Sequence, residues 1–375
     1  MTGALPRRAL LGALAAGPAA AQGQPRLRIL IAAEGLRDLA PLLPAPPGWV
    51  LEVTEEHPSF VGGPLAESVR RRAPLADLVI VGLPGMELGR RRNVWDALPP
   101  ALAAAAPSAD PAALSPGLRH IRDLVEREAL ALTAAPGGPG LLHLPRDRVR
   151  PPRTPRELLD FARQDPRGFL YPRLDSSASG LHFAVSLPYL LNDRDPADPQ
   201  TGWDRSWAYL EALDPHIAYY PVSTLAAMEE LKEGGCALIT GTILGHITGR
   251  VRGRLPADTQ LALFDGAPVL PLGVVALVPR FITAEAAAGV AALAPLLFEP
   301  RLQGLGFGRG ILPGEPPWPG TPAVALPPDE QAALDALLPT TVAAEIAARP
   351  VARPLAHEFH AHLLLRWDQQ IAGRR

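Results

Sequence analysis

The feature that most constrains the fold of this chain is a regular alternation of short apolar runs with helix-like segments close to its amino terminus. Runs at 26–33, 49–54 and 76–81 are rich in Leu, Ile and Val and predict β-strands. Residues 36–43 and 65–72 lie between them and have the composition of helices. This alternation predicts an α/β fold, in which helices cover both faces of a mostly parallel sheet. Ligands of such sheets bind beyond the carboxyl ends of the strands, so the loops after these strands are candidate binding segments.

The length of the chain predicts two lobes, because 375 residues exceed the usual single domain of about 150 residues. Hydrophobic residues make up 47% and charged residues 20% of the sequence, which is typical of a globular rather than a disordered protein. The 36 basic and 38 acidic residues nearly cancel, which argues against nucleic acid as a partner. The single cysteine, Cys236, excludes an intramolecular disulfide and a cysteine-rich metal site, and its apolar neighbours predict burial.

Residues 1–21 have the pattern of an export signal peptide. The basic pair Arg7-Arg8 precedes an apolar stretch at 9–16, and small residues end at Ala21, after which we expect cleavage. The paired arginines resemble a twin-arginine signal, while the Sec route stays open. The apolar stretch is shorter than the ~20 residues that cross a bilayer. The mature protein is therefore expected in the periplasm, without a membrane-spanning segment.

The remainder of the chain continues the alternation of strands and helices. Residues 130–144 predict two strands separated by a glycine turn, where the chain crosses to a second lobe. Thr154, Pro155 and Glu157 have the pattern of a capped helix start. The further expectations are strands at 169–172, 219–222, 236–240, 260–264 and 272–278, a loop at 249–254, and helices at 155–164, 182–191, 203–213, 223–232, 283–298, 328–338, 341–348 and 357–371.

Several segments resemble, in the same order, the motifs of one protein family. Residues 151–159 (PPRTPRELL), 168–172 (GFLYP) and the pair Ser179-Gly180 are similar to the second lobe of type II periplasmic solute-binding proteins, which feed ABC importers. The strand at 76–80 (ADLVI) and the region 278–303 are similar to other motifs of that family. The resemblance extends over roughly residues 26–303.

This resemblance implies two α/β lobes with mixed, mostly parallel sheets flanked by helices and a cleft between them. The first lobe would be discontinuous, at 26–130 and 265–375, and the second would be 131–264, with a hinge near 129–134 and 261–272. The implied function is that of the substrate-binding component of an ABC import system: a monomer that captures a small solute and delivers it to an inner-membrane permease. No catalytic residue, cofactor or metal is expected. A periplasmic hydrolase or transferase on an α/β scaffold, and a sensor lobe, stay open as alternatives.

The loop 175–180 (DSSASG) is the strongest binding candidate. A small-residue loop that opens a helix presents backbone N–H groups and hydroxyls, which suit an anionic group, although an ordinary helix cap has the same residues. Loops at 55–64 and 82–85 would face it from the first lobe, where Glu34, Glu56 or Glu87 could hold a cationic group. The expected ligand-binding residues are Glu34, Ser59, Phe60, Gly62, Gly63, Gly85, Tyr171, Ser176, Ser177, Ser179, Gly180, Gly241 and Thr242. For each of them, a turn residue that satisfies the local backbone is the competing interpretation.

Three histidines near the carboxyl terminus, His357, His360 and His362, suggest a metal site, because the first two share a helix face. The zincin spacing would require a histidine at position 361, which is alanine. A solvated terminal helix is therefore favoured over a metal site. The glycines at 306–310 lack the lysine and flanking elements of a phosphate-binding loop, and no nucleophile-elbow motif is present.

Overall fold

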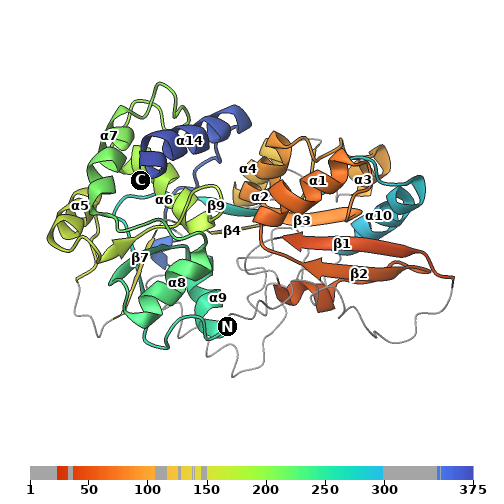
Figure 1. Cartoon of the computed structure of the whole chain (residues 1–375), viewed down its shortest axis with the longest axis horizontal. Coiled ribbons are helices and arrows are strands. Elements are labelled where there is room, and N and C mark those ends of the chain that lie inside the picture. The colour runs from red at the N-terminus through yellow and green to blue at the C-terminus, as the bar shows by residue number, and fades with distance from the viewer. Residues whose placement is uncertain are drawn as a thin grey trace, which may run out of the picture.

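The computed structural model contains two lobes, each built around a β-sheet (Figure 1). The predicted signal peptide at 1–21, Glu34, the glycines at 306–310, the Pro-rich stretch 313–328 and the expected helix at 328–338 lie outside the residues that the structure describes. The described residues are 23–32, 37–105, 116–125, 128–136, 138, 140–144, 150–298, 344–346 and 348–374.

The first sheet has five strands: β1 (Arg26–Ala32), β2 (Val50–Glu55), β3 (Leu78–Gly82), β4 (Leu130–Pro136) and β9 (Pro271–Leu277). They lie in the order β2-β1-β3-β9-β4. β1 pairs in parallel with β2 and β3, whereas β9 is antiparallel to both β3 and β4. The three strands that the amino-terminal pattern predicts are therefore confirmed, and the sheet is mixed.

The second sheet has four strands: β5 (Gly140–His143), β6 (Phe169–Leu170), β7 (Leu238–Gly241) and β8 (Gln260–Leu263). Their order is β6-β7-β5-β8, with β5 antiparallel to both of its neighbours and β6 parallel to β7. Because β4 and β5 belong to different sheets, as do β8 and β9, the chain passes twice between the lobes. The first passage follows Pro136, so residues 129–134, expected as a crossing, lie mostly within β4.

Helices cover both sheets (Figure 1). Those beside the first sheet are α1 (Ala66–Arg70), α2 (Leu83–Arg91), α3 (Pro100–Ala105), α4 (Pro116–Val125) and α10 (Ala284–Leu297). Those of the second lobe are α5 (Pro155–Gln164), α6 (Ala178–Leu190), α7 (Asp204–Leu213), α8 (Thr224–Glu233), α9 (Ile243–Val251) and α14 (His357–Gln370). Short 3₁₀ helices are η1 (Arg37–Leu42), η5 (Asp214–His216) and η6 (Ala372–Arg374), and η2 (Val61–Leu65) is a π-helix.

Capping side chains specify several of these helix starts. Thr154 Oγ1 accepts a hydrogen bond from the backbone N–H of Glu157 at 3.2 Å, and Pro155 is the first residue of α5. Ser223 and Thr283 cap α8 and α10 in the same way. Each cap satisfies an N–H group that a helix start otherwise leaves unpaired. The predicted helices at 155–164, 223–232 and 283–298 are confirmed.

Each sheet has its own large hydrophobic core. Leu27, Ile80 and Val290 are buried in the first core. Leu363 and Trp367 of α14 are buried in the second, beside the side chains that cover β6 and β7. The sequence interpretation assigns this carboxyl-terminal helix to the first lobe, whereas its buried side chains belong to the second core.

Three segments of the first lobe have a helical structure that differs from the expectation. The expected helix at 36–43 is the 3₁₀ helix η1, which includes Pro41. The expected loop at 55–64 becomes helical from Ser59 and continues through η2 into α1. Residues 83–85 of the expected loop at 82–85 form the first turn of α2. The backbone N–H groups of a first helical turn have no partner within the helix, so Pro84, which has no N–H, is well suited to this position.

Two expectations fail in the second lobe. The expected strand at 219–222 forms no strand. The expected loop at 249–254 begins inside α9, a helix that Thr242 caps by accepting a hydrogen bond from the N–H of Gly245 at 2.9 Å. Residues 243–251 contain two glycines and have no clear helical pattern. The cap by Thr242 accounts for the helix that forms there.

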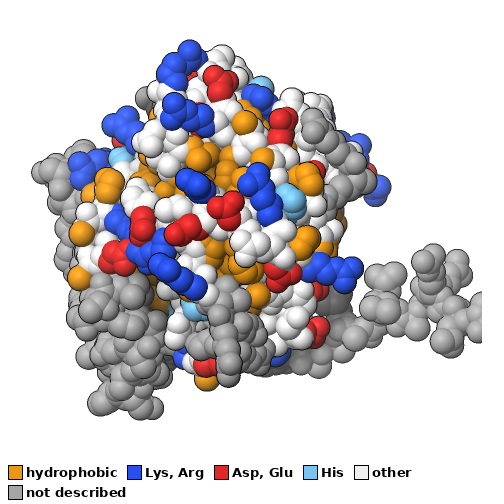
Figure 2. Space-filling model, turned by 90° about the vertical axis from the view of Figure 1, so that its left-hand side faces the viewer, with side chains coloured by type: hydrophobic (Ala, Val, Ile, Leu, Met, Phe, Trp, Pro, Cys, Tyr) orange, Lys and Arg blue, Asp and Glu red, His pale blue; other side chains and the backbone are white. Residues whose placement is uncertain are grey.

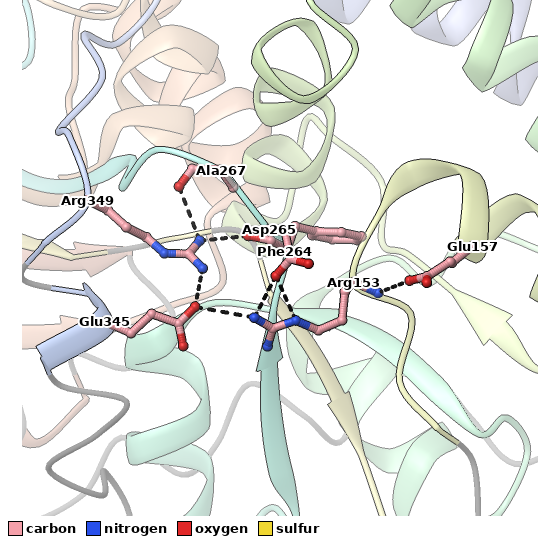
Figure 3. A network of polar contacts seen from close by, with 7 residues as sticks. All are labelled: Arg153, Glu157, Phe264, Asp265, Ala267, Glu345 and Arg349. Atoms are coloured by element: carbon pink, nitrogen blue, oxygen red, sulfur yellow. Dashed lines mark hydrogen bonds and ion pairs between the residues drawn. The ribbon is translucent and has the colours of Figure 1, made fainter.

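A polar network fastens the segment before α14 to the second lobe (Figure 3). Arg349 donates hydrogen bonds to the carbonyls of Phe264 at 2.8 Å and Ala267 at 3.1 Å, and it pairs with Glu345. Arg153 pairs with Asp265 at 2.6 Å and reaches Glu345 at 3.5 Å. The carboxyl-terminal segment therefore returns to the second lobe before α14 begins.

The end of the molecule formed by the second lobe carries interspersed acidic and basic side chains (Figure 2). This mixture agrees with the formal net charge of −2. None of the helices in the described ranges combines the length and the apolar character that a membrane crossing requires.

Candidate functional site

A pocket lies between the two lobes, and we call it the interlobe pocket. It contains about 460 Å³ of empty space, part of it open to solvent. α2 and α4 contribute to its wall from the first lobe, and α6 and α14 contribute from the second. The end of the passage from β8 to β9 and the segment before α14 complete the wall. Its position between separately packed cores makes this pocket the candidate site.

Glu87 is the acidic group of the interlobe pocket. Its side chain is only 4% exposed, and its Oε1 accepts a hydrogen bond from Arg90 at 2.7 Å and another from Nδ1 of His357. Among the described residues, none donates a hydrogen bond to Oε2 of Glu87. Burial raises the pKa of Glu87 above its usual range, and the opposing influence of His360 and Arg90 is smaller. The buried carboxylate therefore lacks full compensation of its charge.

His182 and His360 are the two other polar side chains of the interlobe pocket. Burial lowers the pKa of each to about 4, so both imidazoles are neutral at neutral pH. Nδ1 of His182 lies 3.0 Å from the carbonyl oxygen of Gly138. Because a carbonyl only accepts, Nδ1 carries the proton and Nε2 is left as an acceptor.

His360 contributes a buried nitrogen that has no partner. Its side chain is 6% exposed, and its Nε2 has no hydrogen-bond partner in the described part of the chain. A buried polar atom without a partner costs about 1–3 kcal/mol of stability, which is the kind of cost that binding sites retain for a ligand. The expectation of a solvated terminal helix is wrong at this residue.

The rest of the wall is apolar. α2 and α4 contribute Leu83 and Leu124, while α6 contributes Leu181 and Val185. The passage into β9 and the segment before α14 add Leu270, Pro271, Pro354 and Leu355. A mostly apolar wall with a few convergent polar groups is typical of a small-molecule site.

The serine-bearing loop lies at the start of α6, one turn before the residues that line the pocket. Ser177 caps this helix, and its hydroxyl lies 3.1 Å from that of Ser179 and 2.7 Å from that of Thr224. Ser176 donates a hydrogen bond to the carbonyl of Val222 at 2.7 Å. These hydroxyls satisfy one another and the local backbone, as the competing interpretation of a helix cap requires.

The other predicted site residues lie in four different places. Tyr171 is fully buried in the second core, where its hydroxyl accepts a hydrogen bond from Trp367 at 3.2 Å. Ser59, Phe60, Gly62 and Gly63 form the helical turn that leads into α1, and Gly62 packs against Leu88 of α2. Gly85 lies on α2, between two residues that line the pocket, and Gly241 and Thr242 lie at the junction of β7 and α9.

Several solved structures of binding proteins are similar to this chain over almost its whole length. The chain matches the periplasmic binding protein P5PA with a TM-score of 0.64 at 12% identity, over 92% of this chain and 99% of that one. A periplasmic thiamin binding protein matches with a TM-score of 0.61 at 13% identity, over 95% and 99%. The substrate binding protein of an ABC transporter from Agrobacterium tumefaciens matches with a TM-score of 0.62 at 14% identity, over 93% and 95%.

This chain has the fold of the periplasmic solute-binding proteins. The resemblance that the sequence motifs indicate is thus confirmed at the level of the fold, and so is the two-lobed α/β architecture. No protein-family model matches the chain, and no curated protein matches its sequence. Within the solute-binding-protein fold, the interlobe pocket is the feature that bears on ligand binding.

The sequence pointed to only part of this pocket. Glu87 is among the acidic residues named for a cationic group, and it does line the pocket. His182 was not predicted as a site residue, because a histidine inside an apolar helix is usually a core residue. His360 was considered only as a metal ligand, and a solvated terminal helix was favoured over that interpretation. A usable signal was the position of His182 one turn after the serine loop, on a helix already expected at the site.

Proposed function

We propose that this protein is the substrate-binding component of an ABC import system, which captures a small solute between its lobes and delivers it to a membrane permease. The observation that carries the proposal is a pocket walled by both lobes in a fold that matches periplasmic binding proteins over almost the whole of both chains. Such a protein binds its solute without changing it, so no catalytic residue is required.

The proposed cycle is an opening and closing of the two lobes. The hinge would consist of the passages from β4 to β5 and from β8 to β9. A solute that contacts both lobes favours the closed state by its difference in affinity for the two states. The permease would then distinguish the closed protein from the open one.

Two of the segments predicted from the sequence would extend the proposed binding surface beyond the interlobe pocket. The serine loop at the start of α6 would meet one end of the solute, and the turn at Ser59–Gly63 would approach it from the first lobe. The interlobe pocket would hold the other end. We assign the two ends of the solute in this way because the residues of α6 that line the pocket begin at Leu181, about one helical turn after the serine loop.

Native mass spectrometry of the purified mature protein tests the proposed function. The expected result is a co-purified small molecule that, added back to stripped protein, raises the melting temperature and is recovered chemically unchanged. Conversion of that molecule would instead support the hydrolase or transferase alternative. A protein that binds no small molecule would contradict the proposal.

We also propose that residues 1–21 direct export to the periplasm. Expression of the full chain in a Gram-negative host, followed by amino-terminal sequencing, is expected to give a periplasmic protein that begins at Gln22. Replacing Arg7-Arg8 with two lysines is expected to stop export if the signal is of the twin-arginine type. Accumulation of uncleaved cytoplasmic protein from the unmodified chain would contradict the proposal.

A further inference from the structure

Each of the three polar side chains of the interlobe pocket is able to accept a hydrogen bond. Glu87 presents Oε2, to which no described residue donates, and His182 presents Nε2 because its Nδ1 donates to Gly138. His360 has a buried Nε2 without a partner in the described part of the chain, and this nitrogen accepts a hydrogen bond when the neutral imidazole carries its proton on Nδ1. A ligand that complements this set must donate hydrogen bonds.

The charge of the pocket also selects among ligands. No lysine or arginine is among the described residues that line it, and the two histidines are neutral at neutral pH. The carboxylate of Glu87 is therefore the only charged group of the wall in the described residues. Arg90 and His357 both bind its Oε1, so Oε2 is left without a described donor, and burial, which removes water from this carboxylate, raises its pKa. An anionic ligand would meet uncompensated repulsion here, and a cationic ligand would relieve it.

The placement of these groups distinguishes an organic cation from a bare metal ion. A metal ion requires its ligands within about 2.0–2.6 Å. In the described part of the chain, no three side chains of His, Cys, Asp or Glu are grouped to hold a metal ion. The eight apolar side chains of the wall instead suit the hydrocarbon body of a small organic molecule.

We propose that the interlobe pocket binds a small protonated organic amine, with its ammonium group facing Glu87, His182 and His360 and its hydrocarbon part against the leucine-rich wall. This inference rests on the proposed solute-binding function and names the chemical class of the solute. The three N–H donors of a primary ammonium match the three acceptors of the pocket. The ammonium also supplies a hydrogen bond to the orphan nitrogen of His360.

A matched series of small probes tests the class of ligand. Calorimetric titrations of the mature protein at pH 7.5 would compare the straight-chain amines from ethylamine to hexylamine with the alcohols and carboxylates of the same length. The expected result is that at least one amine binds ten-fold or more tightly than its matched alcohol, and that no carboxylate binds. Amines that bind no more tightly than the alcohols would overturn the inference.

Two variants separate the pocket carboxylate from its neighbouring ion pair. Glu87→Gln keeps the shape but removes the charge, and it is expected to weaken amine binding at least ten-fold. Glu128→Gln is the control, because Glu128 also pairs with Arg90 but does not line the pocket, and it should preserve affinity. Equal affinities of the two variants would overturn the inference, and the melting temperature of each ligand-free variant shows that it is folded.

The co-purified solute distinguishes failure of this inference from failure of the proposed function. Recovery of an amine by native mass spectrometry supports both. Recovery of a solute without a basic nitrogen overturns the amine class and leaves the solute-binding function standing. Absence of binding by every probe and every co-purified molecule overturns both.

Discussion

Two buried histidines make the stability of this protein depend on pH. His182 and His360 have a pKa of about 4 in the folded protein, against about 6.5 in the unfolded chain, because burial disfavours the charged imidazole. The unfolded chain therefore binds more protons between these values. Their contribution is complete above pH 6.5 and is lost as the pH falls from 6.5 toward 4. Glu87 has the opposite sign, because its raised pKa favours the folded state as the pH falls, but one carboxyl opposes two imidazoles.

Urea unfolding between pH 7.5 and pH 5 checks this dependence. The free energy of unfolding is expected to fall on acidification, with each histidine contributing at most about 1.4 kcal/mol per pH unit below pH 6.5. His360→Leu removes one of the two groups and should flatten the curve. His216→Leu, in the short helix η5 outside the pocket, is the matched control. Identical pH dependence in the two variants would contradict the assignment.

Two of the glycines predicted as ligand-loop residues have different structural roles. A Cβ atom on Gly180 would lie 2.1 Å from the carbonyl oxygen of Pro172, whereas a Cβ atom on Gly63 would have no neighbour within 4 Å. Gly180→Ala is therefore expected to destabilise the protein by about 2–3 kcal/mol, through displacement of the first turn of α6. Gly63→Ala should be neutral or stabilising by up to about 1 kcal/mol, because alanine restricts the unfolded chain.

Denaturant midpoints of these two glycine variants give the comparison directly. A Gly180→Ala protein as stable as Gly63→Ala would show that α6 can shift away from Pro172 at little cost. The pair also shows what a sequence leaves ambiguous at the scale of a residue. A glycine required by close packing and a glycine at an open turn have the same letter, and only the neighbouring backbone distinguishes them.

At the scale of elements, the fold was predictable where a short stretch of sequence contains all the residues that determine the element. The β-branched runs that became β1 and β3 and the capped start at Thr154 belong to this class. The helical turn from Ser59 was not predictable, because its sequence of glycines and a proline is typical of loops. In the structure this turn packs closely on α2, where Gly62 contacts Leu88. Such a contact between separate elements is not visible in the local sequence.

The same distinction applies to the candidate site. Glu87 follows a strand end, and general rules of α/β sheets direct attention there. His360 lies more than 270 positions later in the chain, on a helix whose sequence is half polar. Its burial depends on the packing of Leu363 and Trp367 in the second core, so a pattern within α14 alone cannot show it.

The polar network in front of α14 makes a prediction at the scale of one segment. Arg349 is 12% exposed and satisfies the carbonyls of Phe264 and Ala267. Arg349→Met leaves both carbonyls without this donor, so we expect a loss of about 2–4 kcal/mol of stability. Arg156→Met, which removes a fully solvated arginine 4.0 Å from Asp160, is the control and should change stability by no more than about 0.5 kcal/mol.

Hydrogen exchange locates the effect of the Arg349 variant. Faster exchange is expected for the N–H groups of Val269 and Ala352, which pair with the backbone of the neighbouring segment. Unchanged exchange at these two positions would show that the network in Figure 3 does not hold the segment in place.

At the scale of the whole molecule, α14 joins the two lobes. Its buried face packs in the second core, while its first residue, His357, donates a hydrogen bond to Glu87 of α2 in the first lobe. In the segment just before the helix, the carbonyl of Ala352 accepts a hydrogen bond from Nδ1 of His120 on α4 at 3.2 Å. Figure 1 shows α14 extending from the second lobe toward α4. These two contacts therefore hold the lobes together on one side of the interlobe pocket.

Removal of both contacts is expected to favour separation of the lobes. A hydrogen bond to a charged group contributes about 1.5–3 kcal/mol and a neutral one about 0.5–1.5 kcal/mol, so the double variant His120→Ala/His357→Ala loses about 2–4 kcal/mol of interlobe attraction. Small-angle scattering of the ligand-free double variant should then show a larger radius of gyration than that of the unmodified chain.

The control Gln369→Ala, on the exposed face of α14, should leave the radius of gyration unchanged. Since a solute that contacts both lobes favours closure, saturating ligand should restore the smaller radius in the double variant. An unchanged radius without ligand would mean that the passages between the sheets alone fix the arrangement of the lobes, and the proposed opening would then have to be abandoned.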